Sequence, residues 1–308
     1  MSFEVPRPVA ATLAAIVAVL VLATILAWVL RGRIPADVAP RLKTWWVIVA
    51  LYAAATVLGR TASLVLLAAT SFLALKEYLT LIPTRRADRV VLLLAYLAIP
   101  LQFYWVGIGW YGMFIIFVPV YMLLALPIPM IMVGETTGFL RAVSTLHWGL
   151  MTCVFSISHA AYLLVLPPLA AAPAGGRGLL LFLLVLTEAN DVAQYCSGKA
   201  FGRLKAVPRI SPGKTLEGLI GGLAASALLA LLLAPLLTPF GWSRALLAGI
   251  GIGCAGFAGD LAISAIKRDL KVKDSGTLLP GHGGTLDRLD SLTYTAPLFF
   301  HAVWYAYY

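Results

Sequence analysis

Charged side chains are scarce in this sequence. Only 12% of the 308 residues are Asp, Glu, Lys or Arg and 61% are hydrophobic, whereas roughly a quarter of the residues in soluble domains are charged. No charged residue occurs from Val90 to Gly134, although a helix needs only about 20 apolar residues to cross a bilayer. This scarcity excludes a soluble globular domain and predicts an integral membrane protein.

Cysteine and histidine are also rare. The three cysteines, Cys153, Cys196 and Cys254, lie far apart within apolar sequence, a pattern that fits neither a disulfide framework nor a set of zinc ligands. Three of the four histidines lie in apolar stretches, and His282 stands alone between glycines. A single loop histidine cannot form a zinc site, so we expect His282 to shape its loop or to contact phosphate.

The long apolar runs predict an all-α polytopic transmembrane protein with nine or ten spans. Only helices and closed barrels satisfy the backbone in lipid, and these continuous runs lack the alternation of barrel strands. The run at 8–30 is longer than the core of a signal peptide and lacks its basic start, so we interpret it as a retained span. The runs cover residues 8–30, 44–59, 61–82, 89–106, 109–133, 142–165, 178–197, 216–239, 245–266 and 291–308.

The chain is predicted to form a single membrane domain, 1–308, with two chemically different parts. Residues 1–180 contain spans joined by short, chemically plain loops, while residues 181–308 contain nearly all the polar clusters and two long loops. We therefore expect the active site in the C-terminal part.

Basic residues are distributed unevenly among the loops. Most of the 23 Lys and Arg residues follow the odd-numbered predicted spans, and cytoplasmic loops collect such residues. The pattern predicts a cytoplasmic active site with both termini outside. It also explains the net charge of +10 as a topology signal beside anionic headgroups, so we do not expect nucleic-acid binding.

The first polar cluster lies within the seventh predicted span and continues to Lys199 and Arg203. Glu188 and Asp191 are three residues apart, which places both on one face of a helix. Ionisable residues inside a span need a partner or a water-filled cavity. Structural pairing with a basic residue of a neighbouring helix is one interpretation, but a polar cavity explains the whole cluster better.

The second polar cluster occupies residues 208–218. Gly213 allows a close backbone approach, Lys214 is cationic, and Ser211 and Thr215 supply hydroxyl groups near a predicted helix N-terminus, where phosphate binds well. The Gly-Lys-Thr triplet is not a P-loop, because the upstream glycine is replaced by proline and no strand is predicted before it. By itself this cluster is weak evidence for a phosphate site.

The third cluster, residues 260–291, is the densest. Asp260, Ser264 and Lys267 recur at i, i+4 and i+7 and share one stripe of the ninth helix. The glycine-rich loop at 280–284 would then let Asp287 and Asp290 face Asp260. Carboxylates beside several basic residues are what Mg²⁺ and a polyphosphate require. A merely solvated, charged loop is the alternative, and the concentration of charge in an otherwise apolar chain argues against it.

The third cluster resembles the signature of the CDP-diacylglycerol synthase family, also called the phosphatidate cytidylyltransferases. Its residues run Ser264-x-x-Lys267-Arg268-x4-Lys273-Asp274-Ser275-Gly276 and then Pro280-Gly281-His282-Gly283-Gly284-x-x-Asp287-Arg288-x-Asp290-Ser291. The segments at 211–218 and 191–203 resemble the other cytoplasmic motifs of that family in the same order. The resemblance covers about residues 187–292.

The resemblance implies an enzyme of phospholipid biosynthesis in the bacterial inner membrane that converts CTP and the lipid phosphatidate into CDP-diacylglycerol and pyrophosphate with Mg²⁺. It also implies a homodimer, and it leaves open whether a monovalent cation joins the Mg²⁺. By motif position, the catalytic residues are Asp260, Asp287, Lys267 and Arg288, with the two aspartates as Mg²⁺ ligands, and the substrate-binding residues are Asp191, Lys199, Ser211, Lys214, Thr215, Ser264, Arg268, Lys273, Asp274, His282 and Asp290.

Two other classes of function would use some of the same residues. An ion-coupled secondary transporter would also use acids inside spans, but it predicts inverted repeats, which the sequence does not display. Another CTP-using lipid enzyme, such as a polyprenol kinase or a CDP-archaeol-type synthase, would share the metal chemistry and differ in product.

Overall fold

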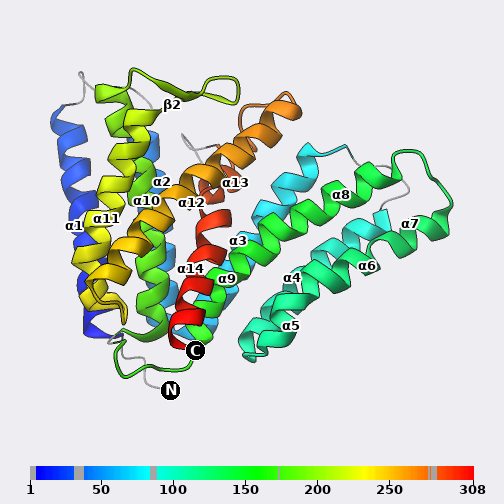
Figure 1. Cartoon of the computed structure of the whole chain (residues 1–308), viewed down its shortest axis with the longest axis horizontal. Helices are drawn as coiled ribbons and strands as arrows, with labels where there is room; N and C mark the ends of the chain where they lie inside the picture. The colour runs from blue at the N-terminus through cyan, green and yellow to red at the C-terminus, as the bar shows by residue number, and fades with distance from the viewer. Residues whose placement is uncertain (1–4, 31–37, 84–88, 173, 277, 279–282) are drawn as a thin grey trace.

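The computed structural model describes the chain except for residues 1–4, 31–37, 84–88, 173, 277 and 279–282. Long helices packed side by side dominate the described residues (Figure 1). Nine of these helices are long and apolar enough to cross a membrane, which confirms the predicted all-α transmembrane class. They are α1 (Arg7–Val29), α2 (Val38–Leu58), α3 (Arg60–Leu81), α4 (Arg89–Gly107), two composite helices (Tyr111–Val133 and Phe139–Val165), α10 (Gly175–Phe201), α11 (Leu216–Leu237) and α12 (Trp242–Asp269).

The tenth predicted span is present as a shorter helix, α14 (Leu292–Tyr307), with 16 residues. At about 1.5 Å per residue such a helix is roughly 24 Å long, compared with a hydrocarbon core of about 30 Å. It is nevertheless well packed, because Phe299, Phe300 and Val303 are completely or almost completely buried. The short α13 (Leu286–Leu289) precedes it.

Each of the two composite helices contains a π-helical segment, and the helix continues on both sides of it. The first consists of α5 (Tyr111–Ile116), the π-helix Phe117–Met122, α6 (Leu123–Ala125) and α7 (Pro127–Val133), and the second of α8 (Phe139–Leu150), the π-helix Met151–Phe155, α9 (Ser156–Tyr162) and the 3-10 turn Leu163–Val165. Pro119 falls inside the first π-helix and Pro127 begins α7, where its missing N–H leaves no hydrogen bond unmade. The prolines therefore do not end this span.

Helices α10, α11 and α12 pack against one another through glycines. A Cβ at Gly222 of α11 would overlap the Gln194 side chain of α10, and one at Gly249 of α12 would lie 2.7 Å from the Ser226 carbonyl oxygen of α11. Small residues at helix interfaces allow the backbones to approach closely in a membrane. This three-helix unit carries two of the three polar clusters and part of the third.

Aromatic side chains join the N-terminal spans to α14. Phe114 of α5 and Tyr162 of α9 both contact the ring of Phe300. Tyr111 stacks on Trp304 with ring centroids 4.2 Å apart and an interplanar angle of 6°. The C-terminal helix is thereby held between α10 and α12 and the N-terminal half.

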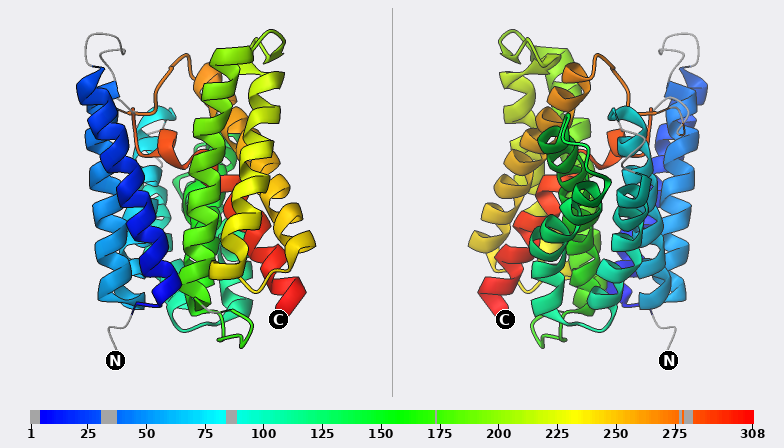
Figure 2. Two further views of the ribbon diagram at one scale, coloured as in Figure 1. Left: turned by 90° about the vertical axis from the view of Figure 1, so that its left-hand side faces the viewer. Right: turned by 90° about the vertical axis from the view of Figure 1, so that its right-hand side faces the viewer.

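A two-stranded antiparallel hairpin separates α10 from α11. Strand β1 (Lys205–Val207) pairs with β2 (Ser211–Thr215), with Lys205 opposite Thr215 and Val207 opposite Ser211. Figure 2 shows the hairpin at the end of the bundle opposite to the start of α1 and the end of α14. The loops that follow α10 and α12 thus lie at one end of the bundle, and the start of α1 and the end of α14 lie at the other.

Candidate active site

Three acidic residues from distant parts of the sequence lie close enough to influence one another electrostatically, and we call them the carboxylate cluster. Asp191 comes from α10, Asp260 from α12, and Asp290 from the turn between α13 and α14. Each of the three helices α10, α12 and α14 contacts the other two, so the fold brings these residues together. The charges of Asp191 and Asp260 both act on Asp290.

Two basic side chains lie beside the carboxylate cluster. The Lys214 ammonium, at the end of β2, lies 2.5 Å from Oδ2 of Asp260 and donates a hydrogen bond of 3.1 Å to Oε1 of Gln194. Arg288 of α13 acts electrostatically on Asp191 and Asp290, and its Nε atom is buried without a hydrogen-bond acceptor. One cation is therefore paired within the protein, and the other keeps an unused donor.

The carboxylate cluster holds more negative charge than its surroundings neutralise. Burial raises the pKa of Asp290 well above its usual value, and the charges of Asp260 and Asp191 raise it further. Oδ1 of Asp191 is buried and accepts no hydrogen bond. Glu188, one turn from Asp191, adds a further acid near Arg288. Such an arrangement makes it costly to ionise all of these acids together.

Asp287 lies in a second group of contacts, the loop anchor, formed with Lys267, Ser275 and Gly284. Its Oδ1 is 2.6 Å from the Lys267 ammonium, and its Oδ2 accepts hydrogen bonds from the backbone N–H groups of Ser275 at 2.8 Å and Gly284 at 3.0 Å. Burial acts to raise the pKa of Asp287, but these partners outweigh it and hold the pKa below its usual value. Both oxygens of this predicted Mg²⁺ ligand are thus engaged by the protein.

Glu77 of α3 extends the loop anchor, and the sequence patterns did not identify it. Its Oε1 accepts a hydrogen bond from the N–H of Thr285 at 2.7 Å, and its Oε2 accepts from the N–H of Leu286 at 2.9 Å and from the Ser275 hydroxyl at 3.1 Å. Figure 2 shows α13 beside the end of α3. The available signal was an acidic residue inside an otherwise apolar span, which is costly unless it has partners.

The glycines of the loop make room for these carboxylates. Gly283 has a φ of +81°, which disfavours other residues, and a Cβ there would lie 2.6 Å from Oδ2 of Asp287. A Cβ at Gly284 would overlap Oε2 of Glu77 and the hydroxyl oxygen of Ser275. The glycine-rich segment is therefore required for a close approach to acidic side chains.

Ser264, Thr215 and Arg268, which were also predicted to bind substrate, lie in three different parts of the structure. Ser264 donates a hydrogen bond of 3.1 Å to Oδ1 of Asp260, beside the cluster. Thr215 caps α11, because its Oγ1 accepts from the N–H of Gly218 at 3.1 Å. Arg268 is exposed and donates from Nε to the carbonyl oxygen of Ile210, which ties the end of α12 to the hairpin.

The other predicted residues lie outside these groups of contacts. Lys199 is exposed on α10, where its ammonium lies 5.8 Å from the centroid of the Tyr195 ring. Ser211 begins β2. Lys273 and Asp274 are both exposed in the loop that follows α12. His282 lies outside the described residues.

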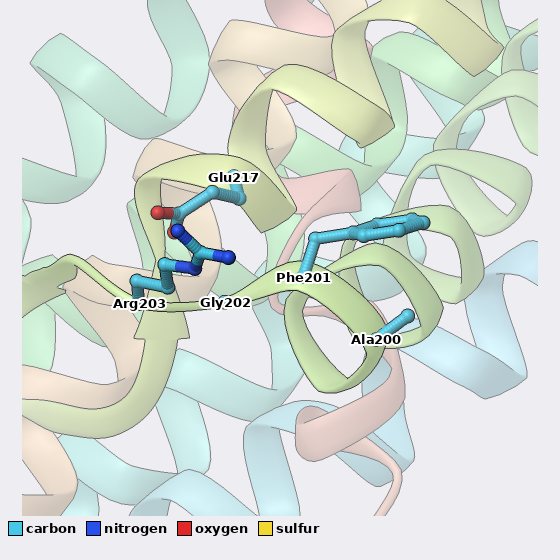
Figure 3. A pocket seen from close by; sticks show the side chains of 5 residues that line it. All are labelled: Ala200, Phe201, Gly202, Arg203 and Glu217. Carbon is cyan, nitrogen blue, oxygen red and sulfur yellow. The ribbon is translucent and has the colours of Figure 1, made fainter.

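An open hollow of about 410 Å³ lies at the end of α10 (Figure 3). Its lining consists of Ala200, Phe201, Gly202, Arg203 and Glu217, and Figure 3 shows the side chains of Arg203 and Glu217 pointing toward each other. No residue of the carboxylate cluster lines it. We therefore place the candidate active site at the cluster and not in this hollow.

Among the described residues, no three or more acidic, histidine or cysteine side chains are grouped so that they could hold a metal ion by themselves. The carboxylates of the cluster thus influence one another without converging on a single point. This arrangement differs from a closed metal cage, in which the protein supplies all the ligands.

Comparisons with known proteins identify the family. A model of the cytidylyltransferase family matches residues 39–306. The uncharacterized protein YnbB of Escherichia coli K12 is 47% identical over 301 residues, which cover 96% of this chain and 99% of that protein.

Enzymes named phosphatidate cytidylyltransferase match a smaller part of the chain. The enzyme from Pseudomonas aeruginosa is 50% identical over 143 residues, 42% of this chain and 49% of its own length. The one from Haemophilus influenzae is 41% identical over 132 residues, 41% of this chain and 46% of its own length. The match thus spans about half the length of these relatives. Together with the family match over most of the chain, these findings establish that the protein belongs to the cytidylyltransferase family, a family of nucleotidyltransferases.

Proposed function

We propose that the protein is a phosphatidate cytidylyltransferase, which makes CDP-diacylglycerol and pyrophosphate from CTP and phosphatidate. The observation that carries the proposal is the half-buried carboxylate cluster of Asp191, Asp260 and Asp290 with Lys214 and Arg288 beside it. A cytidylyltransferase must bring two polyanions together, so it needs both a site for cations and basic side chains for phosphate.

The reaction fits a site without a strong protein base. A phosphate oxygen of phosphatidate attacks the α-phosphorus of CTP, a new P–O bond forms, and the bond to the bridging oxygen breaks as pyrophosphate leaves with the electron pair. The attacking oxygen is already anionic near neutral pH, so no proton has to be removed from it. Catalysis then consists mainly of orienting two anions and balancing their charge.

We propose that Mg²⁺ binds at the carboxylate cluster, with Asp260 as one ligand. Mg²⁺ is usually held by one or two carboxylates together with substrate phosphates and water, and not by a cage of protein ligands. Three neighbouring carboxylates, one with an unpartnered oxygen on Asp191, suit that mode. When bound, the ion supplies charge neutralisation for the triphosphate and the leaving pyrophosphate.

In this scheme the protein's own residues bind and orient the substrates. Lys214 pairs with Asp260 in the structure and can turn to a phosphate once a cation occupies that carboxylate. The buried Nε donor of Arg288 is suited to a phosphate oxygen. Asp287 contributes by holding Lys267 and the glycine-rich loop in place.

We also propose that the site faces the cytoplasm of a bacterial inner membrane. The hairpin and the ends of α10 and α12 near it are rich in Lys and Arg residues, as the cytoplasmic side of a membrane protein is. Phosphatidate could then keep its acyl chains in the bilayer while CTP enters from the water. The homodimer implied by the family resemblance stays a prediction.

The position of a radioactive label in the product tests the reaction. Detergent-purified protein is given phosphatidate and CTP labelled at either the α- or the γ-phosphorus, with Mg²⁺ or with EDTA. We expect the α-label in the lipid, the γ-label in pyrophosphate, and no reaction in EDTA. The γ-label in the lipid would instead indicate a kinase, and no consumption of CTP would refute a cytidylyltransferase.

Substitution of a cluster residue connects the reaction to this site. Asp260→Asn should abolish transfer, because it removes a carboxylate of the cluster. The matched control is Asp269→Asn, which makes the same chemical change at the exposed end of the same helix. Equal activity in both variants would remove Asp260 from the site.

A further inference from the structure

Glu77 is the one acidic residue of α3, and it holds a segment about 200 positions later in the chain. Each of its two carboxylate oxygens accepts a backbone N–H at the start of α13, from Thr285 at 2.7 Å and from Leu286 at 2.9 Å. Backbone N–H groups at the start of a helix have no partner within that helix. Glu77 satisfies them from a different helix of the bundle.

Ser275 connects Glu77 to the loop anchor. Its hydroxyl donates to Oε2 of Glu77 at 3.1 Å, while its backbone N–H donates to Oδ2 of Asp287 at 2.8 Å. Asp287 in turn pairs with Lys267 of α12. A continuous set of hydrogen bonds therefore runs from α3 through the loop to α12.

The segment held by Glu77 carries three side chains of the candidate active site. Asp287 and Arg288 belong to α13, and Asp290 follows it directly. Within the described residues, the other side-chain bond to the backbone at the start of α13 is the one from Gly284 to Asp287, which belongs to the same segment. Glu77 is thus the contact that relates this short helix to the N-terminal half of the protein.

We infer that Glu77 is a positioning residue, which fixes α13 so that Arg288 and Asp290 face Asp191 and Asp260; this inference rests on the proposed function. A Cβ at Gly259, next to Asp260 in α12, would lie 2.5 Å from the backbone oxygen of Asp290, and the Ser291 hydroxyl donates to the Gly256 carbonyl oxygen of α12 at 3.2 Å. A small rotation of a four-residue helix would move Arg288 and Asp290 away. Glu77 does not belong to the carboxylate cluster. It acts on the cluster through the hydrogen bonds that its own carboxylate accepts from α13.

Both oxygens of Glu77 are required as acceptors. In Glu77→Gln one oxygen becomes an NH₂ group, which would face the N–H of Thr285 or Leu286, and two donors cannot share a hydrogen bond. In Glu77→Asp the carboxylate is kept on a side chain shorter by one methylene, so it can accept some of the bonds. The two variants therefore separate the acceptor chemistry from the reach of the side chain.

A positioning role and simple stabilisation predict different kinetics. If Glu77 only stabilised the fold, the folded fraction of Glu77→Gln would keep the wild-type kcat. If it positions α13, the folded variant should lose kcat, because a misplacement of about 1 Å costs roughly 100-fold. KM for CTP should rise only through Arg288, which moves with α13, since the contacts that hold Lys214 do not involve Glu77.

The test compares wild type, Glu77→Gln, Glu77→Asp and the matched control Lys76→Gln, an exposed neighbour on the same helix. The kcat and KM of each are measured on the folded fraction isolated by size-exclusion chromatography. Hydrogen–deuterium exchange of the peptide covering residues 283–289 reports directly on the two N–H groups. We expect a kcat roughly 100-fold lower and faster exchange in Glu77→Gln, intermediate values in Glu77→Asp, and wild-type values in Lys76→Gln.

Two results would overturn the inference. One is a wild-type kcat in folded Glu77→Gln, and the other is an unchanged exchange rate at residues 283–289. If the wild-type protein itself transfers no cytidylyl group, the proposed function fails instead, and the exchange comparison still decides whether Glu77 holds α13. The two failures are therefore distinguishable.

Discussion

Lys267→Met breaks the most deeply buried ion pair described in the structure. Lys267 is 8% exposed and Asp287 is 5% exposed, and their charged atoms are 2.6 Å apart. Methionine has a similar length but no charge, so the substitution leaves the carboxylate of Asp287 buried without its cation. We expect the variant to be markedly less stable and inactive.

The magnitude follows from what remains around Asp287. Removal of one partner from a buried pair costs about 3–5 kcal/mol. Asp287 keeps the N–H bonds from Ser275 and Gly284, and hydrogen bonds to a charged group contribute about 1.5–3 kcal/mol each. These bonds keep the charge partly compensated, so we expect the lower limit, about 3 kcal/mol.

A double-mutant cycle isolates the pair. Asp287→Asn in the Lys267→Met background removes the buried charge. The double variant should therefore lose about 2 kcal/mol less unfolding free energy than the sum of the two single losses. The free energy of unfolding is measured by denaturant titration in detergent micelles, followed by tryptophan fluorescence. Lys267→Met, Asp287→Asn and the double variant should all be inactive, because each of them lacks the ion pair.

Additivity would refute this reasoning. If the single losses sum to that of the double variant within about 0.5 kcal/mol, the two side chains do not interact as the structure describes. A loss below about 1 kcal/mol in Lys267→Met would equally mean that the pair is solvated and contributes as a surface pair does.

Three further predictions concern other parts of the site. Asp260→Asn should lower cytidylyl transfer by at least about 100-fold, while its unfolding midpoint should equal that of Asp269→Asn. Wild-type activity in Asp260→Asn would contradict the assignment of the active site to the carboxylate cluster. Gly284→Ala should lower activity because its Cβ overlaps Glu77, whereas Gly107→Ala has open space and should be neutral; the radiolabel assay compares them. Thr215→Ala should lose about 1 kcal/mol of stability through the α11 cap, and Thr215→Ser should keep it, as denaturant titration would reveal.

Local sequence patterns were sufficient for the class of fold and for some of the contacts in the candidate site. The apolar runs predicted the spans because the helix length needed to cross a bilayer is fixed by physics. The i, i+4 spacing of Asp260 and Ser264 placed them together, and they are hydrogen-bonded. The expectation that the chain folds back to bring Asp290 near Asp260 agrees with the close approach of the Asp290 backbone to Gly259, the residue before Asp260.

Contacts between distant segments could not be predicted in the same way. No periodicity links Glu77 to Thr285, because 208 positions separate them in the sequence and their contact depends on the packing of the whole bundle. The partner of Asp287 was equally hidden, since it depends on the path of the glycine-rich loop. The hairpin that carries Lys214 was interpreted only as a loop before a helix, since its two strands are three and five residues long.

The hydrogen bonds of Glu77 have a consequence for exchanging parts between relatives. A chimera that joined the first spans of one family member to the catalytic helices of another would contain every aspartate of the site. It would still need a carboxylate at this one position of α3, facing a loop of matching length. Beyond the packing of α3 on its neighbours, compatibility between the halves thus depends on this side chain, and recombination points after α3 require that donor and recipient share that carboxylate and the loop it binds.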